Sequence, residues 1–455
     1  MSKVKPALLR GFDQEYLPRE QLQFNGLVDL IRRNFELYGF LPIETPSAER
    51  KEVLTSKGGV EKEIYALSRL AAGADDDEAA TKGALRFDLT VPLARYVAMR
   101  ERELAFPFRR YQIQRVWRGE TPQARKGRFR EFYQCDIDII GREKLSYLAE
   151  AEIPGVINSV FTQMQIGAFR IRINNRKLLK GLLQHFKVPP GSAAAVLRIL
   201  DKSGKEDASR IRAQLEQEGM AGPSARDLFQ LVTEKRDTRE TLQALSKYGE
   251  CEAGLDQLTA IVDAIRKFGV PDSAFGVDLG VVRGLDYYTG TIYETTLVDY
   301  PELGSICSGG RYDDLASYFT DTRLPGVGIS IGLTRLFSKL KEAGLLKAPA
   351  RTPAEVLVTT MEGQDLGSYL GMARLLREAG INTEVYLESG KLKNQLAYAE
   401  KKGFRVALIA GDTEFAKQVV QVKNLAARSA ADCPRGELVA AVRLILQHSQ
   451  ELKSS

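Results

Sequence analysis

Histidine is nearly absent from the chain: only His185 and His448 occur among its 455 residues. His185 lies in a stretch with helical periodicity, and His448 lies near the C-terminal end. Both are better interpreted as solvated or core side chains than as ligands. This scarcity argues against a catalytic triad that depends on histidine and against a histidine-rich metal site.

Cysteine is scarce too, and its positions show no recognisable spacing. The chain contains no CxxC pair, and its four cysteines are scattered: Cys135, Cys251, Cys307 and Cys433. We therefore expect a reduced, cytoplasmic protein without structural zinc or any other fixed metal site. A Walker A phosphate loop and a GxSxG nucleophile elbow are also missing from the sequence.

Long apolar runs are missing as well. No run approaches the roughly 20 residues that a membrane-spanning helix needs, and the first 20 residues lack the apolar core of a secretory signal. We expect a soluble protein with no membrane partner, in keeping with 44% hydrophobic and 27% charged residues. The net charge of +6 permits a polyanionic partner without requiring one.

The length of the chain predicts two to four domains. Residues 20–38 have the apolar spacing of an amphipathic helix, which Gly39 ends. Two β-rich runs, residues 109–120 and 128–141, are joined by a short polar segment, which predicts a long antiparallel hairpin with a basic tip. Residues from about 190 to 270 are rich in alanine, lysine and glutamate at helical spacing, and we interpret them as a helical insertion.

Strand and helix patterns alternate in the C-terminal part of the chain, from Ala354 onward. This alternation predicts a small α/β domain with a largely parallel sheet. Before it, further strands and one helix are expected at residues 275–280, 291–298, 326–333 and 333–343. We therefore divide the chain into a domain over residues 1–345, a linker over 346–353 and a second domain over 354–455.

The predicted hairpin carries the first candidate site. Gln134 and Asp138 alternate with Asp136 in one strand and so share a face, while Arg118 and Glu120 end the other strand. Such acceptors could hold an ammonium group while a guanidinium binds a phosphate or carboxylate. The alternative is a surface hairpin with solvated charges. Against it, the opposite face is expected to be apolar, with Phe132, Tyr133, Cys135, Ile137 and Ile139.

Three further segments combine glycine with polar or aromatic residues. Residues 283–290 (RGLDYYTG) suit a turn that presents polar groups to a pocket, or equally a tight turn with core tyrosines. Residues 307–313 (CSGGRYD) allow a close backbone approach or form an ordinary hairpin. Residues 326–335 (GVGISIGLTR) place glycines within a strand, where a planar ligand or another backbone approaches, and bring Arg335 to the following helix.

In their order along the chain these segments resemble the signature set of the class II aminoacyl-tRNA synthetases, and specifically the histidyl-tRNA synthetase family. The resemblance covers essentially the whole chain. Residues 39–49 resemble motif 1, residues 115–132 motif 2 and residues 326–335 motif 3. The segments RGLDYYTG and SGGRYD resemble the two signatures that are specific to the family.

The resemblance implies an α+β architecture: a catalytic domain on an antiparallel sheet with a helical insertion, followed by an α/β anticodon-binding domain. It implies that histidine is bound by Asp88, Leu89, Thr90, Arg118, Gln134, Asp138, Arg283, Tyr287, Tyr288 and Tyr312. It also implies that ATP is bound by Arg118, Glu120 and Arg335, and that Arg118 and Arg283 are catalytic.

The activity implied by the resemblance is the ligation of L-histidine to histidine tRNA, with ATP as a substrate and Mg²⁺ accompanying it. A homodimer is also implied, because motif 1 belongs to the family's interface. The alternative is a catalytically silent relative that serves as a regulatory subunit of ATP phosphoribosyltransferase. Such relatives usually lose the second domain or erode the signatures, and both are retained in this sequence.

Overall fold

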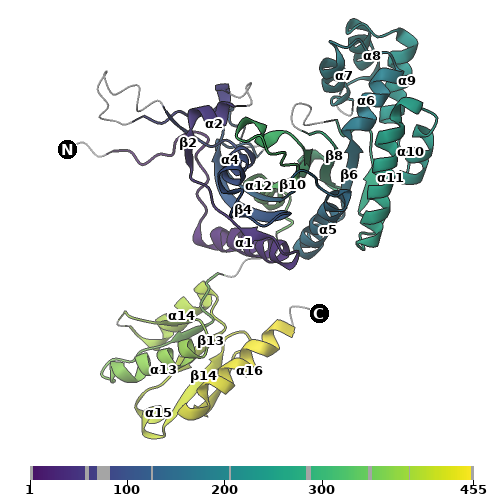
Figure 1. Ribbon diagram of the computed structural model, residues 1–455. Coiled ribbons are helices and arrows are strands. Elements are labelled where there is room, and N and C mark those ends of the chain that lie inside the picture. The colour runs from purple at the N-terminus through teal and green to yellow at the C-terminus, as the bar shows by residue number, and fades with distance from the viewer. Residues whose placement is uncertain are drawn as a thin grey trace. The chain divides into compact units, whose positions relative to one another are not determined.

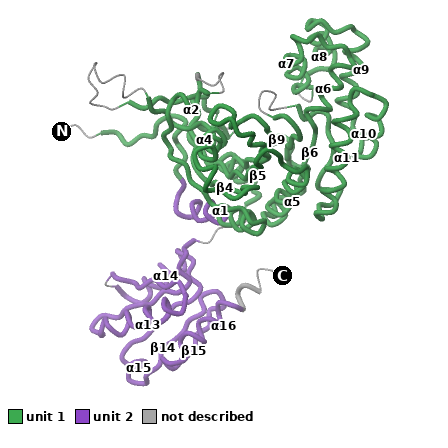
Figure 2. Tube along the Cα trace, in the orientation of Figure 1, with its two compact units in different colours: residues 1–15, 27–346 green, residues 16–26, 347–455 purple. Residues whose placement is uncertain are grey.

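The computed structural model describes residues 4–56, 61–68, 82–123, 127–203, 206–282, 288–346, 351–388 and 390–451. The chain divides into two compact units, coloured separately in Figure 2. The first unit contains residues 1–15 and 27–346, and the second contains residues 16–26 and 347–455. Among the described helices, none has the length and apolar character needed to cross a membrane.

The first unit is built on one sheet of eight strands, in the order β1-β4-β5-β10-β9-β8-β6-β7. From β4 to β6 every neighbouring pair is antiparallel, and the short strands β1 and β7 join the two edges in parallel. The strands span Leu41–Pro42 (β1), Phe108–Trp117 (β4), Glu131–Ile140 (β5), Gly326–Gly332 (β10), Ser305–Tyr312 (β9), Thr291–Leu297 (β8), Phe169–Asn175 (β6) and Phe275–Val277 (β7). The expected α+β fold on an antiparallel sheet is confirmed.

The long hairpin predicted from the sequence forms the centre of this sheet. β4 and β5 pair from Phe108 opposite Ile140 to Trp117 opposite Glu131. Odd-numbered residues face the helices α1 (Pro18–Leu37) and α5 (Tyr147–Met164), where Arg109 pairs with Glu152 of α5 at 2.9 Å. Helix α12 (Leu333–Glu342) directly follows β10, and all three helices are labelled in Figure 1. The ring of Tyr111 packs on Phe35 of α1 at 6.0 Å between centroids. Even-numbered residues therefore share the other face, where the polar side chains gather.

Strand β9 was not among the predicted strands, because its adjacent glycines indicated a turn. It lies between β8 and β10, near the middle of the sheet. A Cβ atom on Gly309 would lie 2.1 Å from the carbonyl oxygen of Gly328 and 2.6 Å from the Cα of Ile329. The close approach is thus made by the backbone of β10, which leaves no room for a side chain at this position.

We expect Gly309→Ala to lower the free energy of unfolding by about 3 kcal/mol or more, because the clash is with backbone that cannot move aside. Gly155→Ala in α5 is the matched control. A Cβ there would meet only the Tyr38 side chain, at an ordinary 3.6 Å, so helix propensity should make this change neutral or stabilising by up to about 1 kcal/mol. Urea unfolding measures both. Equal stability of the two variants would contradict the packing of β9 against β10.

Smaller elements surround the N-terminal side of the sheet. A two-stranded sheet pairs β2 with β3, and α4 leads from it toward the main sheet. The bounds are Ala48–Arg50 (β2), Lys51–Thr55 (α2), Gly83–Leu85 (β3) and Thr90–Arg100 (α4). The guanidinium of Arg86, which follows β3, is buried and donates to the carbonyl oxygen of Arg115 at 2.9 Å, so this sheet is tied to β4.

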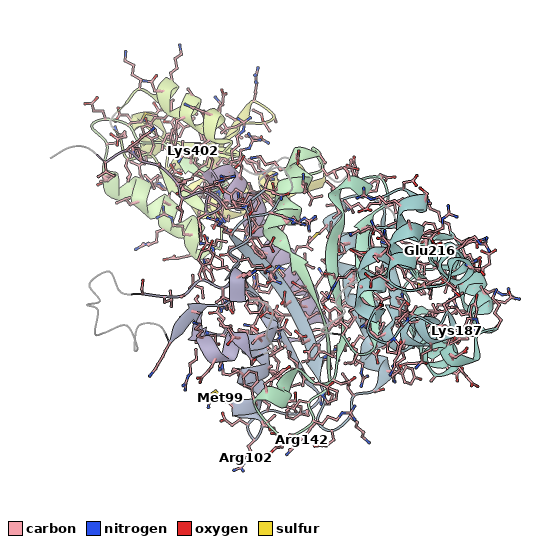
Figure 3. All side chains as sticks on the ribbon, turned by 90° about the horizontal axis from the view of Figure 1, so that it is seen from above. Met99, Arg102, Arg142, Lys187, Glu216 and Lys402 are labelled. Atoms are coloured by element: carbon pink, nitrogen blue, oxygen red, sulfur yellow. The ribbon has the colours of Figure 1, made fainter. Side chains whose placement is uncertain are left out.

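Helices fill the region between β6 and β7, where a helical insertion was expected. They are α6 (Arg176–His185), α7 (Ala193–Leu200), α8 (Ala208–Gln217), α9 (Gly222–Thr233), α10 (Thr238–Leu245) and α11 (Glu252–Lys267). Charged side chains such as Lys187 and Glu216 project from its outer surface (Figure 3). At its base, His185 Nδ1 lies 3.0 Å from Glu250 Oε2, and Gly181 leaves room for the backbone of Glu250.

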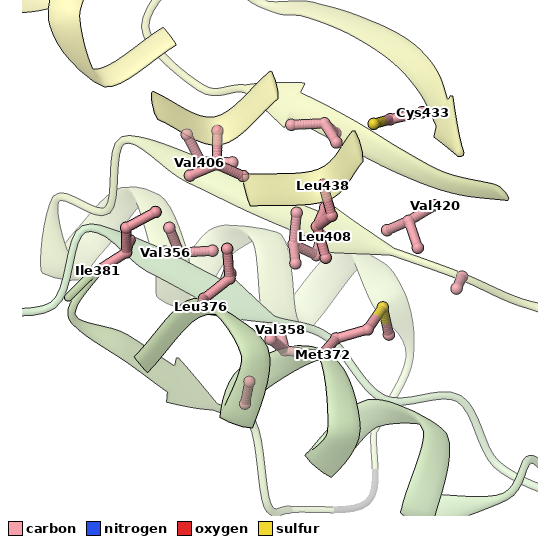
Figure 4. Close-up of a cluster of buried hydrophobic side chains, with 14 of the residues drawn as sticks. Val356, Val358, Met372, Leu376, Ile381, Val406, Leu408, Val420, Cys433 and Leu438 are labelled. Atoms are coloured by element: carbon pink, nitrogen blue, oxygen red, sulfur yellow. The ribbon is translucent and has the colours of Figure 1, made fainter. Parts of the chain in front are cut away.

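The second unit contains a five-stranded sheet in the order β12-β11-β13-β14-β15. Its strands are Val356–Val358 (β11), Thr383–Val385 (β12), Val406–Ile409 (β13), Val419–Asn424 (β14) and Ser429–Pro434 (β15). Its helices are Leu366–Glu378 (α13), Leu392–Lys402 (α14), Asp412–Ala416 (α15) and Leu438–Glu451 (α16). Residues including Val358, Leu376, Leu408 and Leu438 form its own hydrophobic core (Figure 4).

The expected α/β character of this unit is confirmed, but the expectation of a largely parallel sheet is only half correct. β12, β11 and β13 are parallel, whereas β13, β14 and β15 are antiparallel. Strand β15 was not predicted. It is an edge strand on which only Cys433 is buried, so its sequence has no apolar alternation.

Candidate active site

A cavity of about 360 Å³ opens on the polar face of the large sheet. It lies among the end of the β4–β5 hairpin, strands β9 and β10, and helix α12. Its lining includes Arg118, Glu120, Arg128, Phe132, Gln134, Ser308, Ser330, Arg335 and Lys339. Four of the residues that the sequence predicted for ATP or histidine are therefore brought together: Arg118, Glu120, Gln134 and Arg335.

Arg118 is oriented by two contacts. Its Nε donates to the carbonyl oxygen of Phe87 at 2.9 Å, and its guanidinium lies over the ring of Phe132 at 5.1 Å. Phe132 was expected on the apolar face of the hairpin, and this is wrong. Phe132 is separated from Gln134 by one residue, so strand alternation puts both on the cavity side.

Helix α12 contributes two cations to the cavity wall. Arg335 and Lys339 are four residues apart and so lie on one face of the helix. Arg335 Nη2 donates to the carbonyl oxygen of Leu303 at 3.3 Å, and Lys339 Nζ lies 2.6 Å from Glu342 Oε2. Arg128, from the returning side of the hairpin, lies 4.0 Å from Glu120. Together with Arg118, these residues form a cationic wall suited to a polyphosphate.

A buried acidic cluster lies beside the cavity on the same sheet face. Asp138 pairs with Arg110 of β4, which is fully buried, and accepts a hydrogen bond from the Tyr312 hydroxyl at 2.7 Å. Asp136, two residues before Asp138 on β5, lies opposite Ser330 of β10. Gln134 Nε2 donates to the hydroxyl of Ser330 at 2.7 Å and so connects the cavity to this cluster.

Strand glycines make room for the acidic cluster. A Cβ on Gly328 would lie 2.1 Å from Asp138 Oδ1, and a Cβ on Gly326 would lie 2.4 Å from the Tyr312 ring. The ring of Tyr288 lies over Gly310, where an added Cβ would be 2.8 Å from the ring. Close approach over these glycines was expected for a ligand or a backbone. The structure shows both backbone, namely the carbonyl oxygens of Ile137 at Gly328 and Thr291 at Gly310, and side chains of the site in this space.

Burial shifts the protonation of this cluster. It raises the pKa of Asp136 to about 7 and that of Asp138 to about 6, although Arg110 opposes both shifts. The charge of Asp88 contributes to each shift, so Asp88 lies near the pair. Burial and the same carboxylates also raise the pKa of Tyr288, which keeps its hydroxyl protonated. Asp88, Asp138, Tyr288 and Tyr312 thus converge on one site.

The pKa of Asp136 predicts a pH-dependent stability. Because it is raised from 3.8 in the unfolded chain to about 7, the folded state binds the proton more tightly and stability falls as pH rises between these values. We expect Asp136→Asn to match the native chain near pH 4 and to exceed it above pH 7. The gain should reach up to about 4 kcal/mol, at 1.4 kcal/mol per pKa unit. Urea unfolding at pH 5 and 8 measures this, and a variant no more stable at pH 8 would contradict it.

Two buried acceptors of the site have no hydrogen-bond partner among the described residues: Gln134 Oε1 and Asp136 Oδ1. Buried polar atoms in proteins are nearly always paired. Acceptors that point into a site suit a ligand with several N–H donors. An amino acid with an α-ammonium group and a side-chain N–H has this character, so these acceptors suit histidine.

The remaining predicted residues fall into two groups. Leu89 is the fully buried N-cap residue of α4 and Thr90 is its first residue; neither lines the cavity. Arg283 and Tyr287 lie outside the described residues. Arg110 was missed, although the hairpin register places it directly opposite Asp138 and would have revealed it. Lys339 and Ser330 carried no signal beyond their spacing from Arg335 and Gly328.

Family comparisons agree with this geometry. The family model described as "Histidyl-tRNA synthetase" matches residues 13–336, and the model described as "Anticodon binding domain" matches residues 355–444. The chain belongs to the histidyl-tRNA synthetase family.

Relatives named histidine–tRNA ligase match over nearly their whole length. The protein from Xanthomonas axonopodis pv. citri is 46% identical, with 99% of this chain and 98% of the relative covered. The protein from Stenotrophomonas maltophilia is 45% identical, with 98% and 99% covered.

Solved structures show the same fold. The histidyl-tRNA synthetase from Nostoc sp. is 39% identical, with a TM-score of 0.88 over 97% of this chain and 99% of that one. A Bacillus halodurans chain described as an ATP phosphoribosyltransferase regulatory subunit/histidyl-tRNA synthetase is 20% identical, with a TM-score of 0.70 over 87% and 97%. At that identity it shows the fold alone. The full-length ligase relatives disfavour the regulatory-subunit alternative.

Proposed function

We propose that this chain joins L-histidine to histidine tRNA in two steps. ATP and histidine first form a histidyl-adenylate with release of diphosphate, and the histidyl group then passes to the tRNA with release of AMP. The observation that carries the proposal is the continuity of the site. A cavity with a cationic wall leads through Gln134 to a buried acidic cluster with unpaired acceptors. This arrangement suits a polyphosphate at one end and a nitrogen-rich amino acid at the other.

In the first step the histidine carboxylate attacks the α-phosphorus of ATP, and negative charge develops without a covalent enzyme intermediate. The chain then has to position both substrates and stabilise that charge. We assign Arg118, with Arg283, to the α-phosphate and the substrate carboxylate. Glu120 meets the adenine amino group and Arg335 follows the β- and γ-phosphates. Mg²⁺ enters with ATP and supplies further positive charge.

The histidine subsite is proposed next to these groups. Gln134 and Asp138 accept from the α-ammonium group and the imidazole, together with Asp88, Leu89 and Thr90 of the segment before and at the start of α4. Three tyrosines, Tyr287, Tyr288 and Tyr312, line the imidazole. The hydrogen bond from Tyr312 and the ion pair with Arg110 hold Asp138 in place for this role.

The roles of the two domains, the oligomeric state and the cellular location are part of the same proposal. The domain from residue 354 to 455 binds the anticodon end of the tRNA, residues 1–345 carry catalysis, and residues 346–353 link them. A homodimer forms through the motif 1 segment, and the protein acts in the cytoplasm. Each of these assignments draws on the family to which the chain belongs.

Amino-acid-dependent exchange between ATP and pyrophosphate tests the function. We expect histidine alone among the twenty natural amino acids to stimulate exchange, because a site built from hydrogen-bonding groups strongly rejects ligands that leave those groups unpaired. Stimulation by another amino acid instead of histidine, or by none, would overturn the assignment.

A further inference from the structure

A partly buried charged cluster lies behind the proposed histidine subsite, between β9 and α5. It consists of Glu150, Thr289, Arg311 and Asp313, and we call it the Arg311 cluster. Arg311 Nη1 donates to Glu150 Oε1 at 2.7 Å and to the carbonyl oxygen of Leu145 at 3.2 Å. Its Nε and Nη2 both donate to Asp313 Oδ1 at 3.2 Å. Glu150 is fully buried, so Arg311 is fixed between the helix and the strand.

The Arg311 cluster holds the backbone and the side chain of Thr289. The amide of Thr289 donates to the carbonyl oxygen of Arg311 at 2.8 Å, and its hydroxyl donates to Asp313 Oδ2 at 2.5 Å. Burial by itself would raise the pKa of Asp313. The hydrogen bond from Thr289 and the charges of Arg311 and Arg323 outweigh burial and lower that pKa below its usual value. Asp313 is therefore an ionised acceptor for Thr289.

Thr289 is adjacent to Tyr288, which reaches the other face of the sheet. The Tyr288 ring lies over Gly310, and its hydroxyl feels the charges of Asp138 and Asp136. Gly290, on the other side of Thr289, packs against the aliphatic part of Arg311, where a Cβ would lie 2.8 Å from Cδ. Of the two neighbours of Thr289, Gly290 therefore packs against the Arg311 cluster and Tyr288 lies at the proposed histidine subsite.

A cluster of this kind contributes less to stability than its number of ion pairs suggests. Desolvation of buried charges offsets much of their mutual attraction, and apolar replacements are often as stable. The cluster instead holds its side chains in one arrangement, because each carboxylate oxygen of Glu150 and Asp313 accepts a hydrogen bond.

We propose that Thr289, Arg311 and Asp313 are positioning residues that fix Tyr288 against the histidine subsite, without touching either substrate. The proposal rests on the proposed ligase activity and adds that specificity for histidine depends on a cluster on the opposite face of the sheet. It predicts an effect on histidine binding that is separable from ATP binding and from folding.

Thr289→Val tests this inference, because it keeps the shape of the side chain and removes the hydroxyl that binds Asp313. We expect KM for histidine in pyrophosphate exchange to rise by roughly 3- to 10-fold, the value of one hydrogen bond, with KM for ATP and the thermal midpoint unchanged. Thr289→Ser keeps the hydroxyl and should restore the native KM. Asp313→Asn, which keeps the shape but loses the charge, should raise KM for histidine in the same selective way.

Glu152→Gln is the matched control. Glu152 lies on α5 two residues from Glu150 and also pairs with a sheet arginine, Arg109, at 2.9 Å, but Arg109 belongs to β4. This change should leave both KM values as they are. An unchanged KM for histidine in Thr289→Val, or an equal rise in both KM values without rescue by Thr289→Ser, would overturn the inference. Failure of the ligase proposal itself would show differently, as a native chain without histidine-dependent exchange.

Discussion

Arg118→Ala is expected to lower kcat/KM for histidine-dependent pyrophosphate exchange by roughly 10²–10³-fold, comparable to the loss of one donor that stabilises developing negative charge. The reason is geometric. The contacts with Phe87 and Phe132 hold the guanidinium at the cavity before substrates arrive, so its charge needs no reorganisation during the reaction. Arg118→Lys should recover little, because an ammonium group reproduces neither the bidentate fork nor the stacking on Phe132.

Arg115→Ala is the control for this experiment. Arg115 lies on β4, three residues before Arg118, pairs with Glu131 at 3.2 Å and stacks on Tyr133 at 5.1 Å. It is half exposed and odd-numbered, so it faces away from the cavity. Its replacement should leave exchange close to the native rate. If Arg118→Ala retained near-native turnover, Arg118 would have a structural role only and the proposed α-phosphate contact would be wrong.

A chain that ends at Leu346 is expected to retain histidine-dependent exchange and to lose most of its tRNA charging. The cavity and the acidic cluster lie entirely within the first unit, and the second unit has a separate core. Contacts with tRNA phosphates are strongly favourable, so we expect kcat/KM for tRNA to fall by about 10²-fold or more, each tenfold loss being 1.4 kcal/mol.

Circular dichroism should accompany this measurement, because residues 16–26 group with the second unit and lose it in the shortened chain. Salt provides the control. KM for tRNA of the full chain should rise steeply with salt, while exchange in both chains should respond weakly. Undiminished charging by the shortened chain would contradict the anticodon-binding role of the second domain.

The sequence predicts the part of the site that depends on local alternation. Gln134 and Asp138 share a face because both are even-numbered residues of one strand, and the structure places them there. Arg118 directly follows β4, which pairs with this strand along its whole length, so local reasoning also reaches the cavity. The same parity rule would have placed Phe132 and Arg110 correctly if it had been applied across the whole hairpin.

Other features depend on contacts between distant segments, and no local pattern contains them. Gly309 looks like a turn residue until the backbone of β10 is known to pass within contact of it. The pKa of Asp136 is raised by burial, and β10, which pairs with β5 at this position, comes from residues 326–332, far along the chain. Thr289 is coupled to Glu150 through Arg311, whose carbonyl oxygen accepts from the Thr289 amide and whose guanidinium donates to Glu150.

The base of the helical insertion has a topological consequence. His185 and Glu250 lie within 3.0 Å of each other, and the glycine at position 181 lets the two ends of the excursion touch. The segment from residue 186 to 249 therefore begins and ends at nearly the same point of the unit. Such a junction is a natural graft site, since foreign domains are best tolerated where the host's cut ends are neighbours. A different segment joined at this point would leave the order of the strands that carry the chemistry unchanged.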